Sequence, residues 1–185
     1  MRVNHAGRDW PVRPDIVNIS WVEVVDWLRS SPELCANVDT LVGVARAGVP
    51  ICTALSYLHP HCSLFFATRS EPRGDKPPEY DFGQEYSNRA SETQRLFELP
   101  KAILGSKSVL IVDDVATTGA TMAGVTQLLL SINPTCKIAY TSFAADTSRL
   151  SQKAPDILSK LCFKIDIDNS ETWVNFPWNL TPLKK

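Results

Sequence analysis

Apolar residues are arranged along the chain in two ways. Some form short continuous runs, and others recur every three or four positions. The continuous runs cover residues 40–45, 64–67, 109–112, 137–143 and 163–167. Runs of this kind are typical of strands that are buried on both faces of a sheet. The sequence therefore predicts a strand at each of them.

Stretches with helical spacing lie between these runs. The spacing predicts helices over residues 21–29, 49–58, 121–131 and 149–160. Ser20 and Glu23 form a capping box at the start of the first helix. Pro50 lies in the first turn of the second, where a missing N–H group costs little. Because strands and helices alternate, we expect an α/β domain with a mainly parallel central sheet flanked by helices.

The 185 residues are expected to form one domain, 1–185, with three segments of distinct character. Residues 1–39 form an N-terminal arm and helix, in which 1–18 are interpreted as an arm or an edge segment. Residues 68–92 are charged, rich in proline and poor in aliphatic side chains. A segment of this length inside a compact domain is usually functional or disordered. Residues 168–185 form a C-terminal tail.

The composition is that of an ordinary globular protein, with 44% hydrophobic and 21% charged residues. The formal net charge is −1 and no basic run is present, which argues against a nucleic-acid partner. No apolar run has the length of a membrane span, and the N-terminal residues lack the apolar region of a secretory signal. We therefore expect neither a nucleic-acid nor a membrane partner.

The cysteines are odd in number and include no C-x-x-C pair. They are Cys35, Cys52, Cys62, Cys136 and Cys162. This spacing disfavours a disulfide framework and a zinc site. Several lie within apolar runs, as reduced core thiols do, so a cytoplasmic location is expected.

The stretch VLIVDDVATTGAT, residues 109–121, joins an apolar strand, two acids and a turn of small residues. Ligands of open parallel sheets bind beyond the carboxyl ends of the strands, where Asp113 and Asp114 are expected. The turn at 117–121 leads into a helix and exposes several backbone N–H groups, so it is predicted to bind a phosphate. Gly119 permits a positive φ or a close backbone approach.

The two carboxylates would repel a phosphate, but they suit the hydroxyl groups of a sugar that carries it, or a bound Mg²⁺. A ribose 5-phosphate therefore satisfies both halves of the stretch. An isolated pair of aspartates would more commonly be solvated acids next to a capped turn. The complete stretch favours the binding site.

Residues 109–121 resemble the binding motif for 5-phosphoribosyl 1-diphosphate (PRPP) in the type I phosphoribosyltransferases. The stretch VGVARAGVP, residues 42–50, is similar to the loop of that family that holds diphosphate, often through a strained peptide. Residues 68–92 fall where the family has a flexible catalytic hood. The resemblance implies the type I phosphoribosyltransferase fold. It also implies a Mg²⁺-dependent enzyme that transfers 5-phosphoribosyl from PRPP to a nitrogenous base and releases diphosphate.

The resemblance also assigns roles to residues. Asp113 and Asp114 would hold the ribose hydroxyls, support positive charge in the transition state and face Mg²⁺ through the hydroxyls or water. Arg69 in the hood would complete the catalytic set. The PRPP-binding residues would be Arg46, Ala47, Gly48, Ala116, Thr117, Thr118, Gly119, Ala120, Thr121, Arg73 and Lys76. Family members are commonly dimers or tetramers, so a homodimer or homotetramer is implied.

The tail ETWVNFPWN, residues 171–179, resembles the tail of bacterial xanthine-guanine phosphoribosyltransferases. By this resemblance Trp173 would stack on the base, and the backbone of Val174 would meet its edge. Trp178 is interpreted as a core residue. The implied acceptor is a purine, and the implied process is purine salvage.

Two positions depart from the purine pattern. Thr117 stands where 6-oxopurine enzymes usually have an aspartate, and threonine is no general base at neutral pH. The stretch after the predicted strand 137–143 lacks the lysine that contacts a 6-oxo group. It has Asp146, which would accept from an amino group or a ring N–H of the base.

Two alternatives therefore stay open. One is an orotate-like pyrimidine enzyme, because TRSEPRGDK, residues 68–76, is similar to the basic hood of orotate enzymes. The other is a non-catalytic regulator that senses PRPP. The long hood favours catalysis, because a sensor has no need to exclude water. A PRPP-making kinase is disfavoured by the short chain and the lack of an ATP-binding loop.

Overall fold

The computed structural model describes residues 2–5, 8–11, 16–69, 80–82, 103–167 and 172–179. Most of the predicted hood, 68–92, lies outside these residues, including Arg73 and Lys76. Arg69 is described by its backbone alone. The predictions made for these side chains stay predictions.

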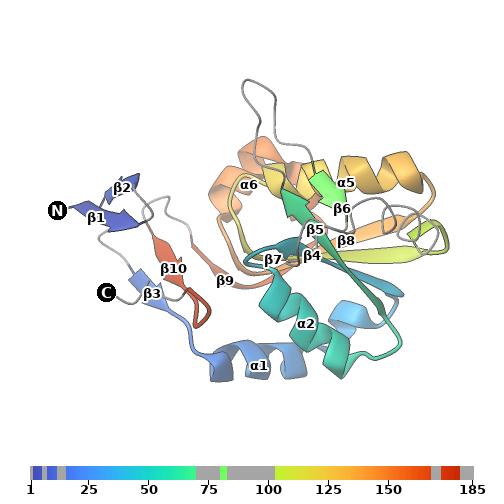
Figure 1. Ribbon diagram of the computed structural model, residues 1–185, viewed down its shortest axis with the longest axis horizontal. Helices are drawn as coiled ribbons and strands as arrows, with labels where there is room; N and C mark the ends of the chain where they lie inside the picture. The colour runs from blue at the N-terminus through green and yellow to red at the C-terminus, as the bar shows by residue number, and fades with distance from the viewer. Residues whose placement is uncertain are drawn as a thin grey trace, which may run out of the picture.

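A six-stranded sheet forms the centre of the molecule (Figure 1). Its strands, in spatial order, are β6 (Tyr80–Phe82), β5 (Ser63–Arg69), β4 (Thr40–Ala45), β7 (Ser108–Ala116), β8 (Lys137–Ala145) and β9 (Leu161–Asp166). All neighbouring strands run parallel except β6, which pairs with β5 in antiparallel orientation. The α/β class and the mainly parallel sheet are therefore confirmed.

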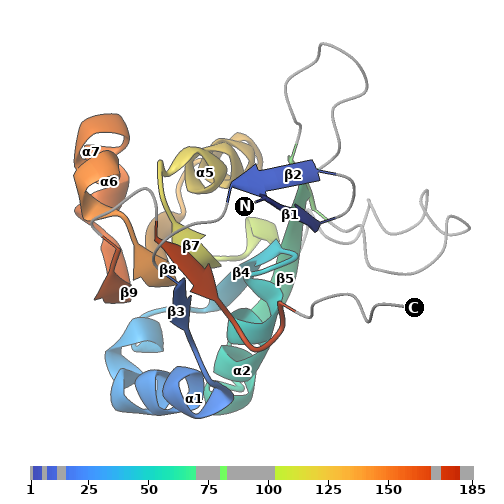
Figure 2. The same ribbon diagram turned by 90° about the vertical axis from the view of Figure 1, so that its left-hand side faces the viewer.

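The helices cover both faces of this sheet (Figures 1 and 2). They are α1 (Trp21–Ser30), η1 (Pro32–Cys35), α2 (Val49–Leu58), α5 (Ala120–Ile132), α6 (Thr147–Lys153) and α7 (Pro155–Leu158). Helices α1 and α2 lie on one face, and α5, α6 and α7 lie on the other. The predicted capping box is present, because the Glu23 N–H donates to Oγ of Ser20 at 3.2 Å and the Ser20 N–H donates to Oε2 of Glu23 at 2.7 Å.

The single helix predicted over 149–160 is wrong. The chain forms α6 and α7 instead, with a break at Ala154, where φ is −151° and ψ is 59°. Pro155 explains the break, since its ring disfavours helical geometry at the preceding residue and it has no N–H to donate.

Two apolar clusters hold the layers together. One lies between the sheet and helices α1 and α2, and at its centre the Phe143 ring meets Trp27 and Phe176 edge to face, at 5.2 and 5.7 Å. The other lies between the sheet and α5 to α7, and includes Met122 and Leu150. All five cysteines are free thiols and four of them are buried, as predicted for core cysteines.

The N-terminal segment predicted as an arm or edge is built from three short strands, β1 (Arg2–His5), β2 (Arg8–Pro11) and β3 (Ile16–Asn18). Strands β1 and β2 form an antiparallel pair, whereas β3 pairs in parallel with β10 (Trp173–Asn175). This pairing brings the beginning of the chain against its tail (Figure 2).

The end of the tail packs onto the first cluster. The Trp178 ring stacks on Phe176 at 4.7 Å and meets Trp21 at 5.2 Å, which confirms the prediction of a core residue. In the described part of the chain, no helix combines the length and the apolar character that crossing a membrane requires.

Candidate active site

The two acids of VLIVDDVATTGAT lie within strand β7, not beyond its end. The strand was predicted over 109–112 but extends from Ser108 to Ala116. The apolar run marked only its buried portion. Backbone pairing with β8 continues past the acids, from Asp113 opposite Ser142 to Ala116 opposite Ala145. The acids are therefore held by a central strand of the sheet.

Asp113 and Asp114 form a pair with little access to water. The Asp113 side chain is buried and that of Asp114 is half-buried. Oδ1 of Asp113 accepts from the Asp114 N–H at 2.9 Å, and Oδ1 of Asp114 accepts from the Val115 N–H at 2.7 Å. No cationic side chain among the described residues pairs with either. Burial, followed by the neighbouring Asp114 charge, raises the pKa of Asp113 well above its ordinary value, and burial raises the pKa of Asp114.

These raised pKa values predict how the stability of the ligand-free protein depends on pH. Above the ordinary carboxyl pKa, the folded state holds more protons than the unfolded state, so the pair destabilises the fold increasingly as pH rises. In Asp113→Asn/Asp114→Asn, amide oxygens replace the carboxylate oxygens as hydrogen-bond acceptors and both negative charges are removed. Its melting temperature should exceed that of the wild type at pH 8, by a margin that shrinks toward pH 4. A margin that is absent, or constant with pH, would contradict the prediction.

The turn after β7 has the geometry expected of the predicted phosphate site. Thr117 and Thr118 are exposed, and Gly119 adopts a φ of 74° at the start of α5. The Ala120 N–H makes a long bond of 3.4 Å to Oγ1 of Thr118, and no described residue accepts from the N–H groups of Gly119 or Thr121. Donors at the positive end of a helix suit an anion.

Gly119 has the positive φ that was one of the two alternatives predicted for it, and it is also tightly packed. Its φ is positive, and a Cβ at this position would lie 2.7 Å from Cβ of Ala154. The break between α6 and α7 therefore packs directly against the turn. Any larger residue would disturb both the turn and that contact.

The loop between β4 and α2 lies beside the acids. Its first peptide bond, Ala45–Arg46, is cis. Arg46 is exposed and Ala47 is half-buried. The Gly48 N–H donates to the Val44 carbonyl at 2.9 Å, so it is occupied within the loop. A Cβ on Gly48 would lie 2.9 Å from Cα of Asp113, which shows how closely the loop approaches β7.

A pocket of about 500 Å³ opens next to the acids on the tail side. It is lined by Asp114, Val115, Thr117, Asp146, Arg149, Ile167, Thr172, Trp173, Val174 and Asn179. The predicted base-binding residues Trp173, Val174 and Asp146 thus share one pocket with Asp114 and Thr117. Trp173 is 40% exposed, whereas the Val174 side chain is buried in the core.

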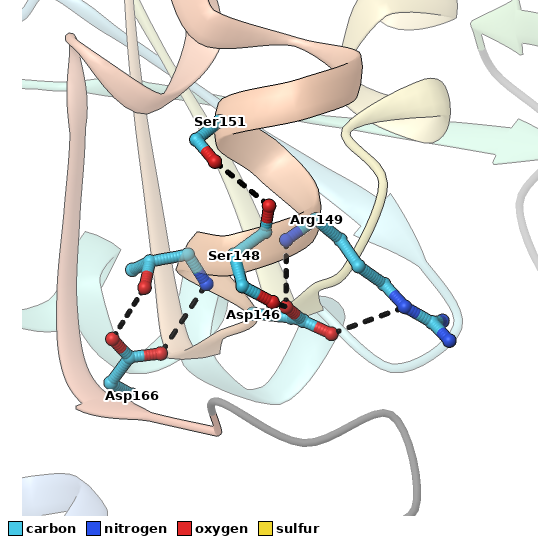
Figure 3. Close-up of polar contacts among 6 residues, drawn as sticks. Asp146, Ser148, Arg149, Ser151 and Asp166 are labelled. Carbon is cyan, nitrogen blue, oxygen red and sulfur yellow. Dashed lines mark hydrogen bonds and ion pairs between the residues drawn. The ribbon is translucent and has the colours of Figure 1, made fainter.

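Asp146 has partners of its own in the structure. It caps helix α6, because Oδ1 accepts from the Arg149 N–H and from the Ser148 hydroxyl, both at 2.9 Å (Figure 3). Its Oδ2 lies 3.4 Å from Nε of Arg149, and its side chain is 1% exposed. Contact with a base, as predicted, would have to compete with these bonds.

Sequence reasoning missed several residues of the pocket, above all Arg149, together with Thr172 and Asn179. A signal for Arg149 was available, since it follows Asp146 at the i,i+3 spacing that brings two side chains together on a helix. In the part of the chain that the structure describes, no group of three or more His, Cys, Asp or Glu side chains could hold a metal ion.

Comparisons with known proteins agree with this geometry. The family model for the phosphoribosyl transferase domain matches residues 25–184. No curated protein matches the sequence.

Several solved structures share the fold. A purine phosphoribosyltransferase from Pyrococcus horikoshii is 22% identical with a TM-score of 0.63, over 92% of this chain and 98% of that chain. The xanthine-guanine-hypoxanthine phosphoribosyltransferase of Helicobacter pylori is 15% identical with a TM-score of 0.58, over 89% and 94%. The orotate phosphoribosyltransferase of Aeropyrum pernix is 16% identical with a TM-score of 0.50, over 80% and 72%.

The identities to these structures are low, so the likeness shows the fold alone. The match of the family model is different in kind, because it covers most of the sequence and includes both VGVARAGVP and VLIVDDVATTGAT. The chain belongs to the phosphoribosyl transferase domain family.

Proposed function

We propose that this protein transfers the 5-phosphoribosyl group of PRPP to a purine base and releases diphosphate. One observation carries the proposal. Asp114 of the acid pair and Thr117 of the turn with free N–H groups line one pocket together with Trp173. A phosphate site, a carboxylate site and an aromatic surface around one pocket suit the phosphate, ribose and base of a nucleotide.

Each part of the substrate has a place in this arrangement. The 5-phosphate binds at residues 117–121, where Thr hydroxyls and the start of α5 supply donors. The ribose hydroxyls face Asp113 and Asp114. The diphosphate lies toward Arg46 and Ala47, at the end of the neighbouring strand β4. Arg69, Arg73 and Lys76 are proposed to neutralise it from the hood.

The acid pair fits a divalent cation that arrives with PRPP. Both carboxyls have raised pKa values and lack a cationic partner among the described residues, and oxygen ligands suit Mg²⁺. Asp113 and Asp114 would hold the ion through ribose hydroxyls or water. When bound, it would supply positive charge that offsets the charge of the diphosphate.

The reaction is a displacement at C1 of the ribose. A ring nitrogen of the base donates its lone pair to C1, and the bond from C1 to the diphosphate oxygen breaks with its electrons on the diphosphate. In a purine the attacking imidazole nitrogen carries no proton, and the proton of the other imidazole nitrogen passes to water, because Thr117 is no general base at neutral pH. Asp113 and Asp114 support the positive charge that develops on the ribose, and their burial strengthens this effect.

A purine is favoured by the pocket. Its volume of about 500 Å³ accommodates a bicyclic base, and Trp173 offers a flat surface for stacking. The Pyrococcus and Helicobacter structures carry purine names, which supports the same choice. The orotate alternative stays open for two reasons. The fold is similar to that of the orotate phosphoribosyltransferase from Aeropyrum pernix, and Thr117 stands where 6-oxopurine enzymes usually have an aspartate.

A direct assay tests the function. The protein is incubated with PRPP, Mg²⁺ and single bases, namely hypoxanthine, guanine, xanthine, adenine and orotate, while diphosphate release and nucleotide mass are followed. We expect nucleotide from at least one purine. Product from orotate alone would replace the purine by a pyrimidine. PRPP binding without any product would rule out the enzyme and leave the regulator.

Replacing Trp173 by alanine should weaken base binding selectively. Loss of one stacking surface costs about 1–3 kcal/mol, so KM for the base should rise roughly tenfold while KM for PRPP stays unchanged. Steady-state kinetics with each substrate varied in turn measure both values. Trp21→Ala is the matched control, because Trp21 is also exposed and does not line the pocket. Equal rises in both KM values would reassign Trp173 to a structural role.

The homodimer or homotetramer implied by resemblance and the cytoplasmic location expected from the cysteines stay predictions. So does the organisation as a single domain over 1–185. Sedimentation of the purified protein, with and without PRPP, would measure the subunit number.

A further inference from the structure

Arg149 is the one basic side chain among the described residues that line the pocket. It belongs to the first turn of α6, the short helix that follows β8. Neither the phosphate turn nor the acid pair requires it. Its position on the pocket wall with Trp173, Thr172 and Asn179 places it where the base is proposed to bind.

The guanidinium group of Arg149 is only partly engaged. Nε lies 3.4 Å from Oδ2 of Asp146, and the side chain is 47% exposed. Within the described ranges, no hydrogen bond or ion pair engages the two terminal nitrogens. Figure 3 shows these nitrogens extending beyond the Asp146 carboxylate. Four N–H donors of a cation are therefore free at the pocket.

The helix that carries Arg149 is held from two sides. Asp146 caps its N-terminus and is bonded through its own N–H to the Ala116 carbonyl of β7 at 2.9 Å. Asp166, from β9, accepts from the N–H and the hydroxyl of Thr147. The start of α6 is thus tied to both β7 and β9. The backbone of Arg149 is thus fixed, and the contact of its Nε with Oδ2 of Asp146 orients the guanidinium group.

Three charged residues line the pocket, namely Asp114, Asp146 and Arg149, and the proposed function assigns Asp114 to the ribose. Asp146 is turned inward and bonded within α6, so it offers little to a ligand. Thr172 and Asn179 are neutral. The free donors of Arg149 suit a carbonyl or carboxylate oxygen, whereas an exocyclic amino group would bring N–H groups against them.

We propose that Arg149 selects acceptor bases that present an exocyclic oxygen, as an oxo or carboxylate group, over bases such as adenine that present an amino group and no oxygen. The proposal rests on the proposed function, since it names the class of acceptor for the same site. The oxo group of hypoxanthine and the carboxylate of orotate both offer an oxygen acceptor to Arg149. Comparing kcat/KM for the two bases shows which of them the protein uses.

The test compares Arg149→Met and Arg149→Lys with Lys153→Met, an exposed cation on the same helix outside the pocket. For each protein, kcat/KM is measured for hypoxanthine, orotate and adenine with saturating PRPP. The wild type should prefer hypoxanthine or orotate to adenine. A charge-assisted bond is worth roughly ten- to a hundredfold, so R149M should lose that much of the preference. R149K should keep part of it, and K153M all of it.

Equilibrium binding of IMP, OMP and AMP to the same proteins separates this proposal from the proposed function. If the wild type forms no nucleotide from any base, the proposed function fails. Arg149 selectivity then still predicts that IMP or OMP binds more tightly than AMP, and that only R149M loses the difference. A wild type that prefers adenine or AMP overturns the role of Arg149. So does an oxo preference that R149M retains with an unchanged melting temperature.

Discussion

Asp113→Asn/Asp114→Asn is expected to reduce turnover by about three orders of magnitude or more. The two carboxylates are the negative charges proposed to face the ribose as C1 becomes positive, and asparagine removes both charges without changing shape. Both amide oxygens can still accept from the N–H groups of residues 114 and 115, so the backbone of β7 should be preserved. Diphosphate release under saturating PRPP and base measures the loss.

The variant has an unusual internal control. Because the charged pair destabilises the fold at neutral pH, its neutral replacement should melt no lower than the wild type there. If the measured melting temperature agrees, loss of turnover cannot be ascribed to unfolding. Asp26→Asn, on the exposed part of α1, changes one charge away from the site and should leave turnover unaffected. Turnover close to that of the wild type in the double variant would remove the acids from the mechanism.

Much of the fold could be predicted because its signals are local. Strands β4, β7 and β8 are apolar runs, and α1 begins at a capping box only four residues long. The turn at 117–121 could be predicted for the same reason, since small residues and a glycine directly before a helix are typical of anion-binding turns. The positive φ of Gly119 agrees with that prediction.

Other parts of the site depend on contacts between distant residues, for which the sequence has no local signal. The pairing of β3 with β10 joins Asn18 to Asn175 across nearly the whole chain and places Trp173 at the pocket. The role of Asp146 as a cap for α6 depended on where β8 ends, and hydropathy placed that end at 143 instead of Ala145. Because Asp146 caps α6, Arg149 lies in the first turn of that helix, where it lines the pocket.

Gly48→Ala should be the most disruptive single substitution in the described site. The φ of Gly48 is −74°, which any residue adopts, so its requirement for glycine is steric. A Cβ would lie 2.4 Å from the Val112 carbonyl oxygen and 2.9 Å from Cα of Asp113, and backbone atoms of a central strand cannot move aside as a side chain can. Overpacking of this kind costs about 3 kcal/mol. The melting temperature should fall by roughly 10 °C, since each kcal/mol corresponds to a few degrees in a chain of this size.

Gly43→Ala is the matched comparison, because it adds the same methyl group to the same strand–loop unit. Its Cβ would lie 2.8 Å from Cβ of Cys52 and 3.0 Å from the Phe66 ring, so α2 must shift slightly, but the overlap is smaller than the 2.4 Å approach to the strand backbone at Gly48. Gly43→Ala should therefore destabilise the fold less than Gly48→Ala.

Turnover should also distinguish the Gly43 and Gly48 variants. The Gly48 variant must push the loop of Arg46 and Ala47 away from Asp113, so its remaining folded fraction should release diphosphate slowly, whereas the Gly43 variant should keep the wild-type rate. Equal melting temperatures in the two variants would show that the loop is not clamped against β7, and the diphosphate would then need another site.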